Sequence, residues 1–197
     1  MSTQDIDVAR LPTYVYGSRS MMWWGTMGLM LIEGTVFAIT VVVYFYLRSH
    51  SATWPVNRAP ELFWGGLNTA IMLGSLLPNW LAKRAAERED RKGARFWLVA
   101  CLLFALAFLV ARVFEFGALN TRWDSNAYGS VVWMLLALHT THLVTDTIDT
   151  AVLAVLMFTG PLEGKRFVDV SENAMYWYFV VGSWLPIYAV IYWGARL

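Results

Sequence analysis

Five apolar stretches, each about as long as a membrane-spanning helix, constrain the fold of this chain more than any other feature. A helix of about 20 apolar residues crosses the roughly 30 Å hydrocarbon core of a bilayer. The stretches cover about residues 22–47, 62–81, 96–116, 131–158 and 174–193. Hydrophobic residues make up 58% of the 197 residues and charged residues only 15%, which excludes a water-soluble fold. We therefore expect an all-α, polytopic membrane protein in which residues 21–197 form one five-helix transmembrane bundle.

Basic residues are distributed unevenly between the two sides of this bundle. Ten lie on the side of the connection between the second and third stretches: Lys83, Arg84, Arg88, Arg91, Lys92, Arg95, Arg10, Arg19, Lys165 and Arg166. The opposite side carries four: Arg48, Arg58, Arg122 and Arg196. Because cytoplasmic loops carry the excess of lysine and arginine, we expect a cytoplasmic N-terminal segment, residues 1–20, and a periplasmic C-terminus. That segment has no short apolar core, so we expect no cleavable signal peptide.

A stripe of four ionisable side chains lies inside the fourth stretch. In a helix His139, His142, Asp146 and Asp149 fall within an arc of roughly 80°, because each residue advances the helix by about 100°. An aspartate in mid-membrane costs roughly 2.5–3.5 kcal/mol, so such residues are usually paired and usually functional. The stripe must therefore face protein or water. Three interpretations are open: a metal site, a buried hydrogen-bond network, and a proton or ion path.

The metal site is the most specific of these interpretations, because His and carboxylates spaced i,i+3 and i,i+4 are ligand spacings in helical bundles. It needs further ligands from other helices, and the sequence offers only Glu33 and Glu115. His139 and His142 together do not suit one haem iron, since neighbours on one helix face cannot take opposite axial positions. We expect no metal and no cofactor in this chain. No motif indicates a catalytic residue or a nucleic-acid partner.

Three more ionisable residues lie within the apolar stretches. Glu33 lies about midway along the first, where it would either form a hydrogen bond between helices or act in proton movement or lipid contact. Arg112 and Glu115 are spaced i,i+3 near the end of the third, which predicts an ion pair within one helix. If they are not paired with each other, either could bind a partner subunit. Cys101 is the single cysteine, which excludes an intrachain disulfide.

Several short motifs follow one another between about Met22 and Gly194. They are Trp24-Gly25 followed by Glu33, Leu67-Asn68-Thr69, Glu115, Tyr128-Gly129-Ser130, His139-x-x-His142, Glu172-x-x-x-Tyr176-Trp177-x-Phe179-Val180-x-x-x-Trp184-Leu185-x-x-Tyr188, and Tyr192-Trp193-Gly194. Each motif is weak alone, but in this order and spacing they resemble subunit III of the haem-copper respiratory oxidases, in its five-helix bacterial form.

The resemblance implies an accessory, non-catalytic subunit of a terminal oxidase that reduces oxygen to water and translocates protons. Such a subunit lies in the bacterial plasma membrane, packs against subunits I and II, and leaves haem and copper to these partners. Its helices form a V-shaped cleft that holds phospholipids, and it supports proton uptake. Glu33 matches the family's cleft glutamate, and His139 and His142 match its paired histidines. Glu115, Glu172 and Trp177 match positions with packing and hydrogen-bonding roles.

The chain departs from the family pattern on two helices. Tyr178 and Val181 stand where the family usually has a histidine and an aspartate, whereas Asp146 and Asp149 occupy positions that are usually apolar or small. We hypothesise that one of these aspartates replaces the missing carboxylate as partner of the histidines. The buried polar network that we expect consists of His139, His142, Asp146, Asp149, Glu115, Arg112, Glu172 and Trp177.

Two other functions are compatible with the sequence. A subunit-III-like accessory protein of a nitric oxide reductase would have the same five-helix outline. From a different class, a free-standing ion- or metal-binding membrane carrier could be built around the aspartate–histidine stripe.

Overall fold

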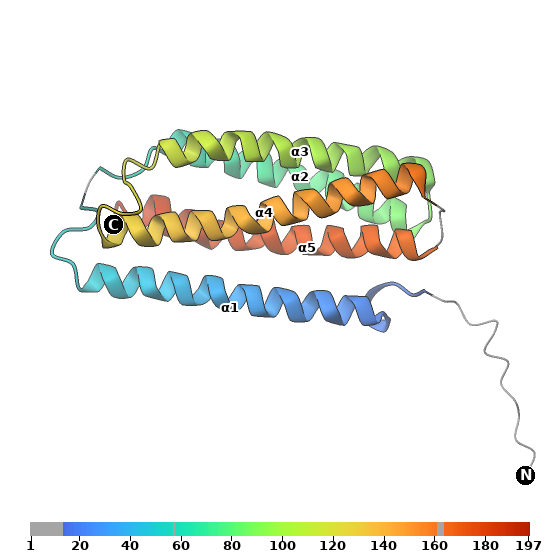
Figure 1. The fold of residues 1–197 in the computed structure, drawn as a ribbon, viewed down its shortest axis with the longest axis horizontal. Helices are drawn as coiled ribbons and strands as arrows, with labels where there is room; N and C mark the ends of the chain where they lie inside the picture. The colour runs from blue at the N-terminus through green and yellow to red at the C-terminus, as the bar shows by residue number, and fades with distance from the viewer. Residues whose placement is uncertain (1–13, 57, 161–163) are drawn as a thin grey trace, which may run out of the picture.

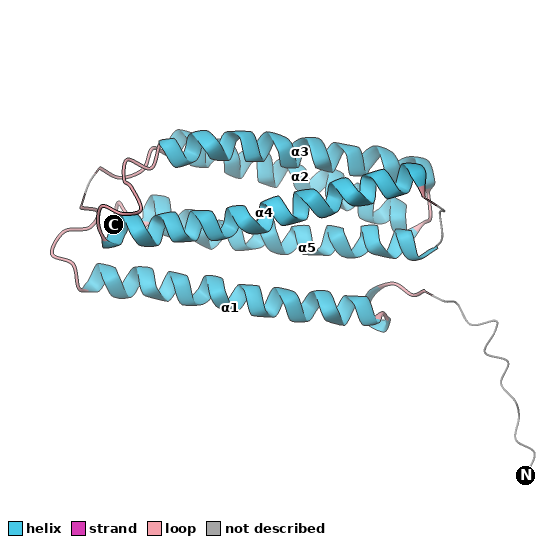
Figure 2. Cartoon of the chain, viewed as in Figure 1, coloured by secondary structure: helices cyan, strands magenta, loops and turns pink. Residues whose placement is uncertain are grey.

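The computed structural model describes residues 14–56, 58–160 and 164–197, which form five long helices lying roughly side by side (Figure 1). The helices are α1 (Met21–Ser49), α2 (Leu62–Glu87), α3 (Arg91–Gly117), α4 (Ala127–Thr159) and α5 (Gly164–Tyr188). A 3-10 turn, η2 (Gly17–Arg19), precedes α1, and a π-helical turn, η3 (Ala189–Trp193), continues α5. No strand occurs in the described residues (Figure 2), so the prediction of an all-helical protein is confirmed.

Among the residues that the structure describes, four segments are long and apolar enough to cross a membrane. They are α1, α3, α4 and the segment Gly164–Trp193, which α5 and η3 form together. α2 has 26 residues, but Asn68, Ser75 and Asn79 are buried along it and charged residues occupy its end, so it is less apolar than the others. The bundle is therefore a membrane protein with several apolar helices.

Helices α3 and α4 begin a few residues before their apolar stretches, and a polar side chain caps the start of each. At the start of α3, the Asp90 carboxylate accepts hydrogen bonds from the backbone N–H groups of Lys92 (3.1 Å) and Gly93 (3.2 Å). At the start of α4, the Asn126 side chain accepts one from Gly129 N–H (2.8 Å). Such caps satisfy N–H groups that have no partner within the helix.

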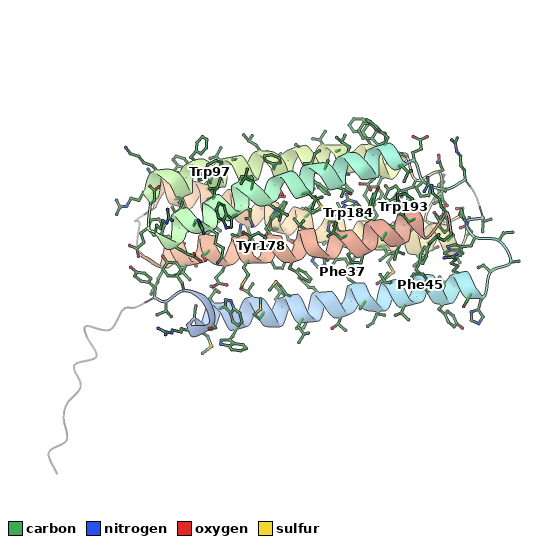
Figure 3. The ribbon with its side chains drawn as sticks, turned by 180° about the vertical axis from the view of Figure 1, so that it is seen from behind. Phe37, Phe45, Trp97, Tyr178, Trp184 and Trp193 are labelled. Atoms are coloured by element: carbon green, nitrogen blue, oxygen red, sulfur yellow. The ribbon has the colours of Figure 1, made fainter. Side chains whose placement is uncertain are left out.

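α1 packs mainly against α4 and α5, on the outside of the bundle that α2 to α5 form (Figure 1). The buried residues of α1 are Phe37, Thr40 and Tyr44, all in its second half. Phe37 lies between α1 and α5 (Figure 3), with its ring centroid 6.4 Å from that of Phe179. The first half of α1 buries none of its residues.

The end of the bundle formed by the α2–α3 turn and the start of α5 is called the basic end below. It carries Lys83, Arg84, Arg88, Arg91, Lys92, Arg95, Lys165 and Arg166. The segment before α1 is tied to this end, because the Tyr14 hydroxyl donates to Glu89 Oε1 (2.7 Å) and the Tyr16 hydroxyl to Ala86 O (3.2 Å). Burial raises the pKa of Tyr16 to about 12, so its hydroxyl remains a donor at neutral pH.

The other end of the bundle closes around a tyrosine. Pro186 lies inside α5, and the chain then continues through η3, which carries Tyr192. The Tyr192 hydroxyl donates to Glu115 Oε1 on α3 (2.6 Å). Its ring passes so close to Gly65 of α2 that a β-carbon at this glycine would overlap the ring. Only a residue without a side chain fits at this crossing.

Gly65→Ala is expected to destabilise the protein, because the added methyl group meets the Tyr192 ring and overpacking costs roughly 1–3 kcal/mol. Gly66→Ala is the matched control, since a β-carbon there comes no closer than 4.0 Å to its neighbour, the Tyr188 hydroxyl. The midpoint of thermal unfolding in detergent compares the two variants. Equal midpoints would contradict a close contact at Gly65.

Candidate functional site

A buried ionic cluster joins α2, α3 and η3 in the half of the bundle away from the basic end. Arg112 and Glu115 have side chains that are 1% and 0% exposed, and Arg112 Nη1 lies 3.1 Å from Glu115 Oε2. The Asn68 amide donates to the same oxygen, while the Tyr192 hydroxyl binds the other one. The ion pair has the i,i+3 spacing noted in the sequence. Asn68 of α2 and Tyr192 of η3 supply the other hydrogen bonds to Glu115.

The Arg112 guanidinium also joins this cluster to α4 and α5. Its carbon lies 4.6 Å from the ring centroid of Phe108 and 4.3 Å from that of Trp184, which are cation–π distances. Arg112 Nη2 lies 3.3 Å from His139 Nδ1, and His139 Nε2 lies 3.0 Å from Val180 O. Because a carbonyl only accepts, Nε2 must carry the hydrogen and Nδ1 must accept from the guanidinium. A neutral His139 satisfies both contacts.

A second cluster ties α1 to α4 and α5. Glu33 Oε1 lies 3.3 Å from His142 Nδ1, and the two side chains are 17% and 14% exposed. The Tyr176 hydroxyl donates to Glu33 Oε2 (2.7 Å) and lies 3.3 Å from the same His142 nitrogen. Phe37 packs beside it, with its ring centroid 5.1 Å from that of His142. The carboxylate that contacts His142 is therefore that of Glu33.

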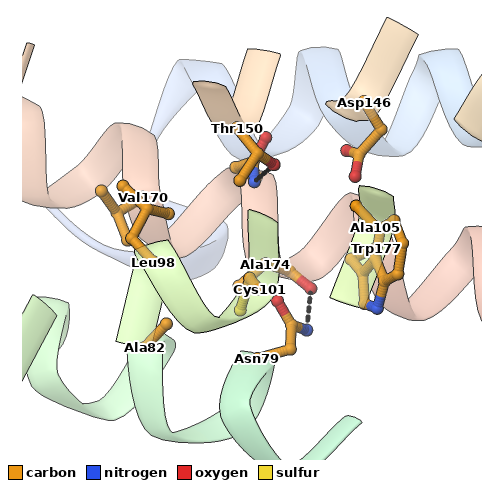
Figure 4. Close-up of a pocket in the computed structure, with 11 residues that line it drawn as sticks. Asn79, Ala82, Leu98, Cys101, Ala105, Asp146, Thr150, Val170, Ala174 and Trp177 are labelled. Atoms are coloured by element: carbon orange, nitrogen blue, oxygen red, sulfur yellow. Dashed lines mark hydrogen bonds between the residues drawn. The ribbon is translucent and has the colours of Figure 1, made fainter. Parts of the chain in front are cut away.

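The aspartates of α4 lie elsewhere. Both carboxyl oxygens of Asp146 are buried and have no hydrogen-bond partner among the described residues. Asp149 is exposed. The structure therefore gives His142 a carboxylate partner from α1, not from α4, which corrects our hypothesis about the aspartates. The Asp146 side chain instead points into the bundle, towards Trp177 (Figure 4).

Asp146 borders a small enclosed cavity of about 10 Å³ between α2, α3, α4 and α5 (Figure 4). Cys101 lines the same cavity. Nearby amides are partly engaged: Asn79 Nδ2 donates to Ala174 O and Asn173 Nδ2 to Thr150 Oγ1, each at 2.9 Å. A cavity of this size holds about one water molecule.

A larger groove, of about 530 Å³, lies between the first half of α1 and helices α4 and α5. Glu33 and Tyr176 line its inner part, and Asp149 and Glu172 line its wall. It coincides with the part of α1 that buries no residue. We call it the α1 groove below.

The two remaining predicted residues, Glu172 and Trp177, lie on α5. Trp177 Nε1 donates to Ser75 Oγ on α2 (2.8 Å), so this indole joins two helices. Glu172 is 6% exposed, and its Oε2 has no partner among the described residues. Trp177 therefore connects two helices, whereas one carboxyl oxygen of Glu172 is buried without a hydrogen bond among the described residues.

The four ionisable residues of the α4 stripe do not form one site. His139 belongs to the ionic cluster, His142 to the cluster with Glu33, and Asp146 and Asp149 to the wall of the α1 groove. Within residues 14–56, 58–160 and 164–197, no three His, Cys, Asp or Glu side chains lie together as metal ligands would.

Several members of these clusters were not predicted as site residues. They are neutral polar or aromatic side chains: Asn68, Tyr176, Trp184 and Tyr192. A single sequence does not indicate which neutral side chains face an ion pair in another helix. The available signal was that all four occur within the motifs that carry the family resemblance.

The fold and these clusters define a helical membrane protein in which buried ionisable groups such as Arg112, Glu115 and His139 hold neighbouring helices together. A family model, "Cytochrome c oxidase subunit III", matches residues 56–196, which include α2 to α5 and η3. The chain belongs to the cytochrome c oxidase subunit III family.

Known members of the family align with much of this chain. The "Probable cytochrome c oxidase subunit 3" of Mycobacterium leprae is 29% identical over 182 residues, 88% of each chain. Cytochrome c oxidase subunit 3 of Triticum aestivum is 30% identical over 84% of this chain and 69% of its own length. That of Neurospora crassa is 29% identical over 66% of this chain and 48% of its own length.

Glu115→Gln is expected to reduce the free energy of unfolding by roughly 3–5 kcal/mol, because it leaves the buried Arg112 charge without its anion. Asp124→Asn is the control: it removes the exposed Arg122–Asp124 ion pair and is expected to cost less than about 1 kcal/mol. Denaturant unfolding in mild detergent measures both. Similar losses would show that the buried pair contributes no more than a surface pair.

Proposed function

We propose that this chain is the accessory subunit III of a haem-copper terminal oxidase, a complex that reduces oxygen to water and translocates protons. The observation that carries this proposal is the family match over residues 56–196, which includes the helices that hold the ionic cluster. The ionisable side chains of that cluster face one another inside the bundle, as suits a subunit that leaves the chemistry to its partners. Haem and copper would belong to subunits I and II.

In this proposal the chain crosses the bacterial plasma membrane five times. α2 provides the fifth crossing, because it packs along α3 and α5 and is of similar length. The basic end faces the cytoplasm and the C-terminus the periplasm, in keeping with the excess of lysine and arginine at that end. The alignment with the Mycobacterium leprae protein over 88% of both chains supports a bacterial form of the subunit.

The α1 groove would be the phospholipid site of this subunit. It opens along α1, where apolar side chains such as Leu29 and Val152 line it, and the Glu33 cluster borders its inner part. A lipid held there would stabilise the complex, because α1 has few buried side chains of its own. Glu33 would link this site to the proton uptake that the subunit supports.

Purification through a tag on this chain, in a gentle detergent, tests the assignment. We expect a large haem-containing subunit to co-purify, together with copper and iron measured by elemental analysis. Non-haem iron without copper would instead indicate a nitric oxide reductase. Recovery of the chain alone, from a membrane that contains an assembled oxidase, would contradict an oxidase subunit.

Glu33→Ala is expected to leave the initial rate of oxygen reduction nearly unchanged but to speed inactivation during turnover, or to slow proton uptake, because it breaks the cluster that ties α1 to the bundle. Oxygen consumption by the purified complex, followed over many turnovers, measures this. Glu61→Gln is the control, since Glu61 is exposed just before α2. Immediate loss of activity with the complex still assembled would contradict an accessory role.

A further inference from the structure

The small enclosed cavity beside Asp146 lies between two helices at opposite corners of the bundle. Helices α2 and α4 each pack against α3 and α5, so they face each other diagonally across the bundle. The Asp146 carboxyl group reaches the cavity from α4, and the Asn79 amide reaches it from α2 (Figure 4). A group bound in this cavity would therefore connect the two corners.

Asp146 is the side chain of this cavity that most needs a partner. It is 1% exposed, and neither of its carboxyl oxygens has a hydrogen bond within the described part of the chain. Among the described residues that line the cavity there is no lysine, arginine or histidine to neutralise a carboxylate. Buried polar groups are nearly always hydrogen-bonded, and an unpaired charge inside a membrane protein is strongly unfavourable. Asp146 therefore requires a hydrogen-bond partner that the described side chains do not supply.

The N–H donors around the cavity are directed to other acceptors. Asn79 Nδ2 donates to Ala174 O, and Asn173 Nδ2 donates to Thr150 Oγ1, each at 2.9 Å. The Trp177 indole donates to a serine of α2. An amide that donates through its nitrogen keeps its oxygen as an acceptor. The lining of the cavity therefore offers acceptors more readily than donors.

One water molecule matches both the size and the chemistry of this cavity. The volume of about 10 Å³ holds a single water, which needs two to four polar partners. A protonated carboxyl group has one O–H donor and an acceptor oxygen, and a water has two donors for the free amide oxygens. A divalent metal ion needs several ligands at one point, and no three His, Cys, Asp or Glu side chains of the described chain meet.

The cavity is separated from the α1 groove by a wall of polar side chains. Asp146 and Asn173 line both spaces. Water and protons can therefore reach Asp146 from the groove without crossing hydrocarbon. The titratable groups around Asp146 are Cys101 of α3 on the side of the cavity, and Asp149 of α4 and Glu172 of α5 on the side of the groove. None of them carries a positive charge that would stabilise an ionised Asp146.

We propose that this cavity is a binding site for one water molecule, which a protonated Asp146 holds against the amide of Asn79. The Asp146 O–H donates to the water, and the water donates to Asn79 Oδ1, so the site connects α4 to α2. The ionic cluster around Arg112 joins the helices in the other half of the bundle. The water site does so nearer the basic end, without a buried charge. It belongs to the bundle itself and does not depend on the role in an oxidase.

Infrared difference spectroscopy tests the protonated acid in the full-length chain, within the complex with which it purifies. A protonated carboxyl group has a carbonyl stretching band that a carboxylate lacks. We expect the spectrum of the natural protein minus that of Asp146→Asn to contain one such band at neutral pH, and we expect the band to shift in D2O. Asp149→Asn is the matched control and should leave this band in place, because Asp149 lies one turn further along α4 but is exposed and outside the cavity.

Electron cryomicroscopy at a resolution that shows ordered water tests the occupant. We expect one density within hydrogen-bond distance of Asp146. It should remain in Asp146→Asn, which keeps a donor and an acceptor, and disappear in Asp146→Leu, which has neither. The infrared band and the density in the natural protein decide the assignment even where Asp146→Leu fails to fold.

Three results would overturn the proposal. Absence of the carboxylic acid band would show that Asp146 is ionised. An empty cavity in the natural protein would show that no water is bound. A density that disappears when choline replaces sodium and potassium in the buffer would identify a monovalent cation as the occupant.

Discussion

The positive charge of Arg112 lies inside a membrane-crossing bundle, and the packing of four helices depends on how this charge is satisfied. No water reaches such a position from the hydrocarbon, so protein groups must supply every partner. Glu115 supplies the anion, Trp184 and Phe108 supply π faces, and His139 accepts a hydrogen bond. These groups come from three helices, while Asn68 of α2 holds the anion in turn. A shift of any one helix would leave a buried polar group without its partner.

α1 is attached in a different way. Its main polar tie in the membrane is the largely buried Glu33–His142–Tyr176 cluster, and its buried side chains occur only from Phe37 onward. The family match begins at residue 56, after α1 has ended. The part of the chain that the family model describes is therefore the four-helix bundle with its ionic cluster. α1 adds a peripheral layer, and with it the groove.

Hydropathy was sufficient to predict the helices but not their ends. α5 begins at Gly164, about ten residues before the apolar stretch, because residues such as Lys165 and Glu172 are helical although they are polar. Local spacing similarly indicated the Arg112–Glu115 pair, which lies within one helix. It could not indicate that His142 pairs with Glu33, more than a hundred residues away, and not with Asp146 on its own helix. Contacts between helices depend on helix rotation, which a single sequence leaves open.

The position of the α1 groove makes the two faces of the membrane inequivalent for this protein. α1 is held at the basic end by Tyr16, at mid-length by Glu33 and, beyond that, by the buried Tyr44, whose hydroxyl accepts a hydrogen bond from Trp54 (2.9 Å). The groove occupies only the interval between the first two ties, about 18 Å of helix from Met21 to Glu33. In the lipid role proposed above, a lipid would therefore enter the groove from one leaflet alone. The composition of that leaflet, and not of the bilayer as a whole, would decide which lipid occupies the groove.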